Sequence, residues 1–431
     1  MEYNRRNFLR RSSRLAGLTA ISTFINPSLA KSVEQALENS SHLTAQEVAK
    51  DETFWYQIRQ AYNVSNTFIN FNNGGVSPQP KVVQEALEYY NRSSNEIPTY
   101  NMWRILKREL VVIKSQLTEI AGCDSGEIVI NRNATEALET IIFGLRLQKG
   151  DEVVLCKQDY PNMINAWKQR EHRDGIILKW VDLKMPIEDK NSIIRSYTDL
   201  FTNQTKIVHI THMINWNGQI LPVKDIAQIA HQRNIEVLVD GAHSFAQFDY
   251  SIPDLECDYF GTSLHKWLCA PFGTGMMYVK KDKIKNLYPL LASEDPESDQ
   301  IEKFEAIGTR SLGIEIAIGH AINFHQMIGI ERKHQRLLYL KNYWIDRVKH
   351  HPKVHIHSPQ NPEFGGAIAL FSIQDKTPHE VHVLLHNKPR IHTVAINHTN
   401  IHGVRITPNV YTLIKEMDKL VKEILKIADS V

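Results

Sequence analysis

The 431-residue chain has few cysteines, no excess of charge of one sign and no long apolar run. Its four cysteines form no CxxC pair, which argues against a disulfide framework and a zinc knuckle. Lys plus Arg number 50 and Asp plus Glu number 48, whereas a nucleic-acid-binding protein usually carries a strong basic excess. No internal apolar run reaches the roughly 18–20 residues that a stable membrane span needs. The GxGxxG and GxxxxGK(S/T) motifs of nucleotide-binding loops are also missing. With 42% hydrophobic residues, the chain is expected to be an ordinary globular protein.

The first 30 residues have the pattern of a secretory signal. RRNFL at positions 5–9 precedes an apolar stretch over 15–25 and the small-residue end SLA at 28–30. The paired arginines indicate the twin-arginine export machinery, which carries folded proteins, and therefore predict a periplasmic protein. A disordered basic N-terminus is the alternative. Because a protein that must acquire a cofactor benefits from folding around it before export, this signal also favours a bound cofactor.

The rest of the chain alternates short β-rich runs with helical stretches. Residues 31–70 are expected to form an N-terminal arm, residues 71–312 a large α/β domain, and residues 313–431 a long helix (313–345) followed by a small α+β domain. Strands alternating with crossover helices predict a mostly parallel sheet flanked by helices, with ligands at the carboxyl ends of the strands. The expected strands are 127–130, 152–156, 176–181, 207–212, 236–239, 259–262 and 275–279, and the expected helices include 102–121, 134–147, 161–172 and 223–233.

Two of these strands run into residues that are suited to catalysis. Strand 236–239 leads into Asp240, and strand 259–262 leads into a segment that contains Lys266. A lysine withdrawn from water becomes a usable amine nucleophile, because burial disfavours its ammonium form. A carboxylate can keep a pyridine nitrogen protonated, so that the ring accepts electrons. The pair fits a Schiff-base site, and from spacing alone it fits a buried structural ion pair equally well.

The blocks VDGAHSFAQFDY (239–250) and YFGTSLHKWLCAPFGTGMMYV (259–279) resemble the class V aminotransferase family of fold-type I pyridoxal-phosphate enzymes. The similarity is greatest to the isopenicillin N epimerase-like branch, and it covers most of residues 65–431. It implies the fold-type I transferase fold and pyridoxal 5′-phosphate as the cofactor. It also implies a homodimer with shared active sites, which neither composition nor spacing indicates independently.

The resemblance assigns roles around the cofactor ring. Lys266 would form the internal aldimine and shuttle the proton on the substrate Cα, and Asp240 would pair with the pyridinium nitrogen. His243 would lie near the phenolic oxygen, Asn215 at the edge of the cofactor, and Tyr160 would stack on the ring through its flat π face. Ordinary structural roles are the alternatives: a core position for His243, a turn for Asn215 and packing for Tyr160.

The phosphate is expected at the start of a helix. Asn133 and Glu136 fit a capping box at a helix N-terminus, and the free N–H groups of that end also suit a phosphate. The two interpretations are compatible. Gly308 and Thr309 match a loop that reaches the phosphate of the neighbouring subunit. The remaining residues that the resemblance places at the phosphate are Ala134, Thr135, Ser263 and His265.

The substrate is expected to be a small molecule, either an amino acid or an amino-acid-derived, peptide-like metabolite. Arg405 lies in an apolar strand and needs an anionic partner, which by resemblance is the substrate α-carboxylate and otherwise is a salt bridge within the protein. Asn73 and Arg104 are weaker candidates, because a turn residue and a solvated helix charge explain them too. Two departures from the family pattern matter. No Cys follows Cys269, so sulfur transfer as in cysteine desulfurases is disfavoured. The C-terminal part is rich in histidines, which leaves metal binding open, but surface or core roles are favoured because no Cys or carboxylate pattern accompanies them.

The resulting hypothesis is a periplasmic enzyme of the epimerase or aminotransferase type. The motifs leave open a lyase and a siderophore-tailoring periplasmic transaminase. From a different class, a protein that binds the cofactor or an amino acid without turnover is a further alternative.

Overall fold

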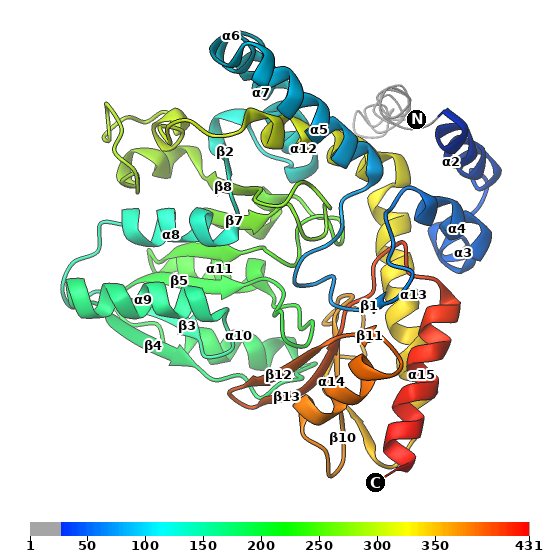
Figure 1. The fold of residues 1–431 in the computed structure, drawn as a ribbon. Coiled ribbons are helices and arrows are strands. Elements are labelled where there is room, and N and C mark those ends of the chain that lie inside the picture. Colours follow the sequence, from blue (N-terminus) through cyan, green and yellow to red (C-terminus); the bar gives the residue numbers. More distant parts are fainter. Residues whose placement is uncertain (1–26, 431) are drawn as a thin grey trace, which may run out of the picture.

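The computed structural model describes residues 27–430, with only the backbone for residues 27–30, so RRNFL and the apolar stretch of the predicted signal lie outside the described residues. A seven-stranded sheet with helices on both faces forms the centre of the molecule (Figure 1), in the order β2-β8-β7-β6-β5-β3-β4. This arrangement confirms the predicted α/β class. Its strands are β2 (Ile128–Asn131), β3 (Glu152–Cys156), β4 (Ile177–Val181), β5 (Thr205–Thr211), β6 (Glu236–Asp240), β7 (Tyr259–Ser263) and β8 (Gly275–Val279).

Strand direction places the polar strand ends at one edge of this sheet. All neighbouring strands from β4 to β7 pair in parallel, whereas β8 runs antiparallel to both β7 and β2. Thr211 and Asp240 are register partners at the carboxyl ends of β5 and β6, and Asp240 in turn pairs with Gly261 of β7. The carboxyl ends of these strands therefore meet at one place, as the sequence predicts.

Burial on both faces explains why the strands are almost continuously apolar. Residues of β2, β3, β7 and β8 are all buried. One face packs against α8 (Ala134–Gly144) and α9 (Pro161–Asp174), and the other packs against α10 (Lys190–Thr198) and α11 (Val223–Gln232). Two separate apolar cores thus sandwich the sheet.

Helix α12 (Leu312–Ile328), which follows the large sheet in the chain, packs against α5 (Lys81–Glu96) and α7 (Lys107–Ala121), which precede it. The single helix expected over 313–345 is incorrect: α12 ends at Gly329, whose φ of +88° is outside the helical region, and α13 (Ile330–Val348) starts anew. The helix expected over 102–121 begins as a π-helix, η1 (Asn101–Leu106), before α7. The other helices of this part are α2 (Pro27–Asn39), α3 (Ala45–Lys50), α4 (Glu52–Gln60) and α6 (Pro98–Tyr100).

The C-terminal part contains a four-stranded antiparallel sheet in the order β12-β13-β10-β9. Its core packs against α13 and α15, and strand β1 pairs in parallel with β11, which ties the start of the large domain to this part. No helix among the described residues is both long and apolar enough to cross a membrane. The elements are β1 (Ile69–Asn70), β9 (Val354–Ile356), β10 (Ala369–Ile373), α14 (Pro378–Asn387), β11 (Ile391–His392), β12 (Val394–His398), β13 (Ile401–Ile406) and α15 (Ile414–Asp429). Short 3-10 helices are η2 (Ser125–Glu127), η3 (Ile252–Leu255), η4 (Lys281–Asn286) and η5 (Ile301–Phe304).

Candidate active site

A pocket of about 340 Å³ lies where the carboxyl ends of β3, β5, β6 and β7 face the β12–β13 hairpin. It brings together most of the residues that the sequence predicts for the site. The predicted residues that line it are Ala134, Thr135, Tyr160, Asn215, Asp240, His243, Ser263, His265, Lys266 and Arg405.

Lys266 points into this pocket and contacts a histidine. Its Nζ lies 3.0 Å from Nε2 of His243. Burial lowers the pKa of Lys266 from the usual 10.5 to about 8; Asp240 opposes this fall and Arg405 adds to it. Burial and the two neighbouring cations also hold the pKa of His243 well below its usual value, so this imidazole is neutral. Part of the lysine is therefore the free amine near neutral pH, as a nucleophile requires.

Asp240 ends β6 and is almost completely buried. Burial raises the pKa of its carboxyl group, whereas the Ala242 amide and the charge of Lys266 act in the opposite direction. Its Oδ1 accepts the N–H of Ala242 at 2.9 Å, and no other described residue hydrogen-bonds to the carboxylate. One carboxylate oxygen is thus left for a partner in the pocket.

The N-terminus of α8 forms one end of the pocket, through Asn133, Ala134 and Thr135. Asn133 Oδ1 accepts the N–H of Glu136 at 2.9 Å, but the Glu136 carboxylate accepts the N–H of Arg132 and not that of Asn133. The predicted capping box is therefore only half formed. The Ala134 N–H donates to Ser263 Oγ at 2.9 Å, so the amide that was expected to bind phosphate already has a partner.

Other donors remain at this end of the pocket. The backbone N–H of Thr135 has no acceptor among the described residues, and the Ser263 hydroxyl can donate outward because its oxygen already accepts a bond. His265 Nδ1 lies 3.0 Å from the carbonyl oxygen of Thr274, which requires the proton on Nδ1. Its Nε2 can therefore donate only in the cationic form, which an anion nearby would favour.

Arg405 on β13 is buried without a carboxylate partner among the described residues. Its guanidinium donates to the carbonyl oxygen of Asn215 at 2.8 Å and to Oδ1 of Asn72 at 2.9 Å, and its Nε has no partner. Burial lowers its pKa to about 10, although the proximity of Tyr160 raises it. A buried cation that meets only neutral acceptors is suited to bind an anionic ligand.

Four predicted residues lie outside the lining of this pocket. Asn73 is fully buried and its amide bonds within the protein to Thr407, Asn70 and Tyr411, so it has no free group for a substrate. Arg104 is exposed on η1. Gly308 and Thr309 are exposed in the loop between η5 and α12.

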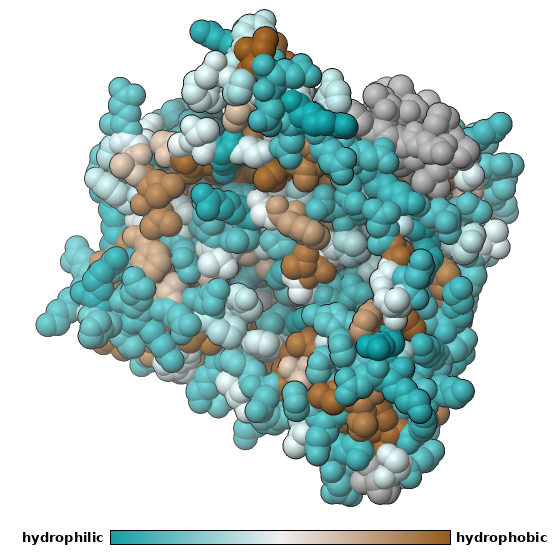
Figure 2. Space-filling model, viewed as in Figure 1, coloured by the Kyte–Doolittle hydropathy of each residue, from teal (hydrophilic) through white to brown (hydrophobic). Residues whose placement is uncertain are grey.

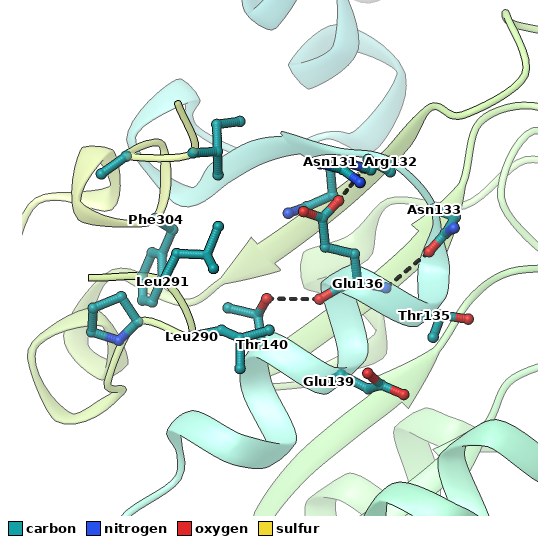
Figure 3. Close-up of a pocket in the computed structure, with 13 residues that line it drawn as sticks. Asn131, Arg132, Asn133, Thr135, Glu136, Glu139, Thr140, Leu290, Leu291 and Phe304 are labelled. Carbon is teal, nitrogen blue, oxygen red and sulfur yellow. Dashed lines mark hydrogen bonds between the residues drawn. The ribbon is translucent and has the colours of Figure 1, made fainter. Parts of the chain in front are cut away.

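A second cavity of about 390 Å³ lies beside the first turns of α8 (Figure 3) and shares Asn133 and Thr135 with the first. Leu290, Leu291 and Phe304 form one side of it, while the carboxylates of Glu136 and Glu139 line the other. The carboxylates of Glu136 and Glu139 outnumber the one arginine of the lining, Arg132, so this cavity is poorly suited to bind a phosphate. The first pocket, which contains Lys266 and Arg405, is therefore the candidate active site.

Sequence reasoning missed several residues of the site. Asn72, and not its neighbour Asn73, reaches Arg405. Gly74 and Gly75 form part of the lining, and their turn cluster was the available signal. Apolar side chains also line the pocket but look like core residues in the sequence: Trp216, Val394 and Ile396.

Cysteines and clustered histidines take no part in the site. None of the four cysteines lines the pocket; Cys123 is partly buried and the other three are buried. His379, His382 and His386 lie along α14 with ring centroids 6.5 and 5.7 Å apart. Within residues 27–430, no group of three or more His, Cys, Asp or Glu side chains is arranged to hold a metal ion.

Comparisons with known proteins agree with this geometry. The family described as "Aminotransferase class-V" matches residues 69–414. A probable cysteine desulfurase of Synechocystis sp. is 27% identical over 73% of this chain and 79% of its own length. The isopenicillin N epimerase of Streptomyces clavuligerus is 24% identical over 85% of this chain and 96% of its own length.

Solved structures share the fold. A mutant of C-DES with glycine covalently linked to its PLP cofactor has a TM-score of 0.78 at 21% identity, and covers 86% of this chain and 99% of its own. An apo cysteine desulfurase from Thermococcus onnurineus has a TM-score of 0.76 at 21% identity, and covers 87% of this chain and 98% of its own. At these identities the likeness shows the fold alone.

Proposed function

We infer the function from the premise that this chain belongs to the aminotransferase class-V family and that its cofactor is pyridoxal 5′-phosphate. We propose that it is an enzyme acting at the Cα of an amino acid or a peptide-like metabolite. One observation carries the proposal: Lys266, Asp240 and Arg405 meet in a single pocket. An amine, a carboxylate and a buried guanidinium are the three groups that such a reaction requires.

Polar atoms without a protein partner support the fit of the cofactor. Within the part of the chain that the structure describes, His243 Nδ1 and Asn215 Oδ1 are buried and unpartnered, and one carboxylate oxygen of Asp240 is free. When Lys266 Nζ donates to Nε2 of His243, the neutral imidazole carries its own proton on Nδ1. Nδ1 would then donate to the phenolic oxygen, and Asp240 would meet the ring nitrogen.

The residues around the bound group have separate tasks. When bound, the pyridine ring accepts the electron pair that is left at Cα. Asp240 would hold the proton on the ring nitrogen, and Lys266 Nζ would take the proton from Cα. Arg405 would hold the α-carboxylate. The groups placed to hold the phosphate are the Thr135 amide, Ser263 and His265.

The finer reaction type that we propose is epimerisation or transamination. Many relatives are named cysteine desulfurases, but this pocket has no cysteine, and burial raises the pKa of Cys123 to about 12, which disfavours its thiolate. Elimination from Cβ needs no enzyme cysteine, so a lyase is the second candidate. Proton exchange at Cα without loss of the side chain distinguishes epimerisation and transamination from elimination.

We also propose a homodimer with shared active sites. The outer arm formed by α5, α6, η1 and α7 carries several large apolar side chains that are half or more exposed, and Figure 2 shows brown atoms at its tip. Such a surface is typical of an interface. The exposed residues of the arm are Tyr89, Ile97, Tyr100, Trp103, Ile105, Val111 and Val112.

A periplasmic location by the twin-arginine route is proposed from the RRNFL pattern at positions 5–9 alone. A siderophore precursor or another exported peptide-like metabolite would then be within reach as substrate.

The proposed function is tested by the absorption spectrum of the purified protein. A visible band that shifts on addition of an amino acid, with deuterium uptake at Cα in D₂O, supports an enzyme acting at Cα. A band that no amine changes contradicts catalysis and supports a protein that only binds the cofactor. Release of an α-keto acid with loss of the side chain would favour the lyase.

A further inference from the structure

One wall of the candidate active site is apolar and has no part in the chemistry proposed above. Trp216 comes from the loop after β5, and Val394 and Ile396 come from β12. Val394 and Ile396 have no polar side-chain atom, and the one N–H of the Trp216 side chain already donates to the carbonyl oxygen of Gln158, so none of the three is placed to bind a phosphate, a ring nitrogen or a carboxylate. Their position in the pocket therefore points to the substrate side chain.

The hairpin places this wall next to Arg405. Val394 of β12 and Arg405 of β13 are direct register partners in the antiparallel pair, and directly opposed residues point to the same face. Ile396 lies two residues further along β12 and so shares that face. A ligand whose carboxylate is held by Arg405 would extend its next atoms over Val394 and Ile396.

Contacts with neighbouring apolar side chains hold this wall in place. Ile396 packs in a small cluster with Leu370 and Ile401, against which Trp216 and Val394 also pack. Apolar side chains that already pack against neighbours on the same face of the sheet present a formed surface to a ligand, so little ordering is needed on binding.

The tip of the hairpin is tied to the large domain. Gln158 Nε2 donates to Asn400 Oδ1 at 2.9 Å, and Asn400 Nδ2 donates to the carbonyl oxygen of Leu183 at 3.0 Å. Trp216 Nε1 donates to the carbonyl oxygen of Gln158 at 2.8 Å, which fixes the indole against the same loop. These bonds keep the hairpin over the pocket.

Charged groups in the pocket are few, and each has a task. Among the described residues of this chain, Asp240 is the one acidic residue of the lining, and apart from two histidines Lys266 and Arg405 are its basic residues. A second charge at the far end of a substrate would therefore lie against the wall without a counter-charge, which is costly.

We infer that the β12–β13 hairpin selects substrates whose side chain is uncharged and apolar. This inference rests on the proposed function, because it takes Arg405 as the group that holds the substrate carboxylate. The expected side chains are aliphatic, and a longer one contacts more of the wall formed by Trp216, Val394 and Ile396.

The test is calorimetric binding of carboxylates that lack an amine to the holoprotein. Hexanoate, adipate and 6-aminohexanoate share six carbons and differ at the far end, and butanoate is the short reference. Hexanoate is expected to bind roughly fifteenfold more tightly than butanoate, because each buried methylene gives about fourfold. Adipate and 6-aminohexanoate are expected to bind roughly tenfold or more weakly than hexanoate, because their second charge is unpaired.

Substitutions on the hairpin sharpen the test. Val394→Lys places a cation on the partly buried face next to Arg405, so adipate should then bind more tightly than hexanoate. His402→Lys is the matched control, because His402 is exposed on β13 and pairs with Asn397, outside the pocket lining. If Val394→Lys does not fold, Val394→Ala should weaken hexanoate severalfold without any gain for adipate.

The outcomes separate this inference from the proposed function. Equal binding of hexanoate and adipate by the unchanged protein, or a reversed preference in the His402→Lys control, overturns the selectivity. Spectral titration with amino acids is run in parallel. A band that responds to no amino acid contradicts the proposed function, even where hexanoate still binds with the expected preference.

Discussion

Lys266 Nζ lies 3.0 Å from Nε2 of His243, and both residues face the pocket that also contains Asp240 and Arg405. The contact joins a lysine whose pKa is lowered to about 8 with an imidazole that is neutral. Because the imidazole is neutral, it contributes no negative charge that would stabilise the ammonium form of the lysine. The amine is therefore available for a carbonyl carbon near neutral pH.

The pKa of Lys266 predicts how the apoprotein takes up pyridoxal 5′-phosphate. The neutral amine is the reactive form, and a lowered pKa means that it is already formed at a lower pH than in a free lysine. The uptake rate measured in a stopped-flow spectrophotometer should rise with pH and level off above about pH 8, not near 10.5.

Two variants test the cause of this shift. Asp240 opposes the fall of the lysine pKa and Arg405 adds to it. The midpoint of the pH profile of cofactor uptake should therefore move to lower pH in Asp240→Asn and to higher pH in Arg405→Ala. A midpoint that stays at the same pH in both variants would show that these charges do not act on the lysine.

Arg405→Ala should weaken amino-acid binding far more than cofactor binding. Loss of a charge-assisted pair costs about 1.5–3 kcal/mol, which corresponds to roughly 10- to 150-fold in affinity. The dissociation constants for an amino acid and for pyridoxal 5′-phosphate are measured by spectral titration. Arg104→Ala is the control, since that residue is exposed on η1. Equal loss of both affinities would contradict the carboxylate role.

Asn133→Ala should lower the free energy of unfolding of the apoprotein by about 1 kcal/mol, because the side chain caps α8 through the N–H of Glu136. Asn133→Ser, which keeps a capping oxygen, should retain most of that stability. Urea unfolding followed by circular dichroism measures the difference. A serine variant as unstable as the alanine variant would show that the cap is not the cause.

Replacement of Arg5 and Arg6 by lysine should trap the precursor in the cytoplasm if the twin-arginine prediction is correct. Cell fractionation and immunoblotting give the ratio of precursor to mature protein. Export at the unchanged rate would exclude this route.

Strand positions were predictable because each buried strand is a short apolar run. β3 and β8 have the expected bounds, and β5 begins two residues earlier than expected, at Thr205. The helix break at Gly329 was not foreseen, because an isolated glycine in a helical pattern is often tolerated. The π-helix η1 gives no periodic signal in the sequence at all.

Within the site, residues next to strand ends were easier to find than residues placed by tertiary contacts. Asp240 and Lys266 follow strands, so topology alone brings them together. The sequence does not show which of Asn72 and Asn73 contacts Arg405. In the structure, Asn72 forms a parallel β-bridge with Thr407 and its side chain contacts Arg405. Val394 gains its role through register with Arg405, which no local pattern reveals.

The central claim is that Lys266 holds the cofactor, and borohydride reduction followed by peptide mapping tests it most directly. The holoprotein is reduced, digested and analysed by mass spectrometry, with Lys266→Ala and, as control, the exposed Lys280→Ala. We predict a pyridoxyl adduct on the peptide that contains Lys266, unchanged in Lys280→Ala and lost in Lys266→Ala. An adduct on another lysine of the unchanged protein, or one that persists in Lys266→Ala, would contradict the account.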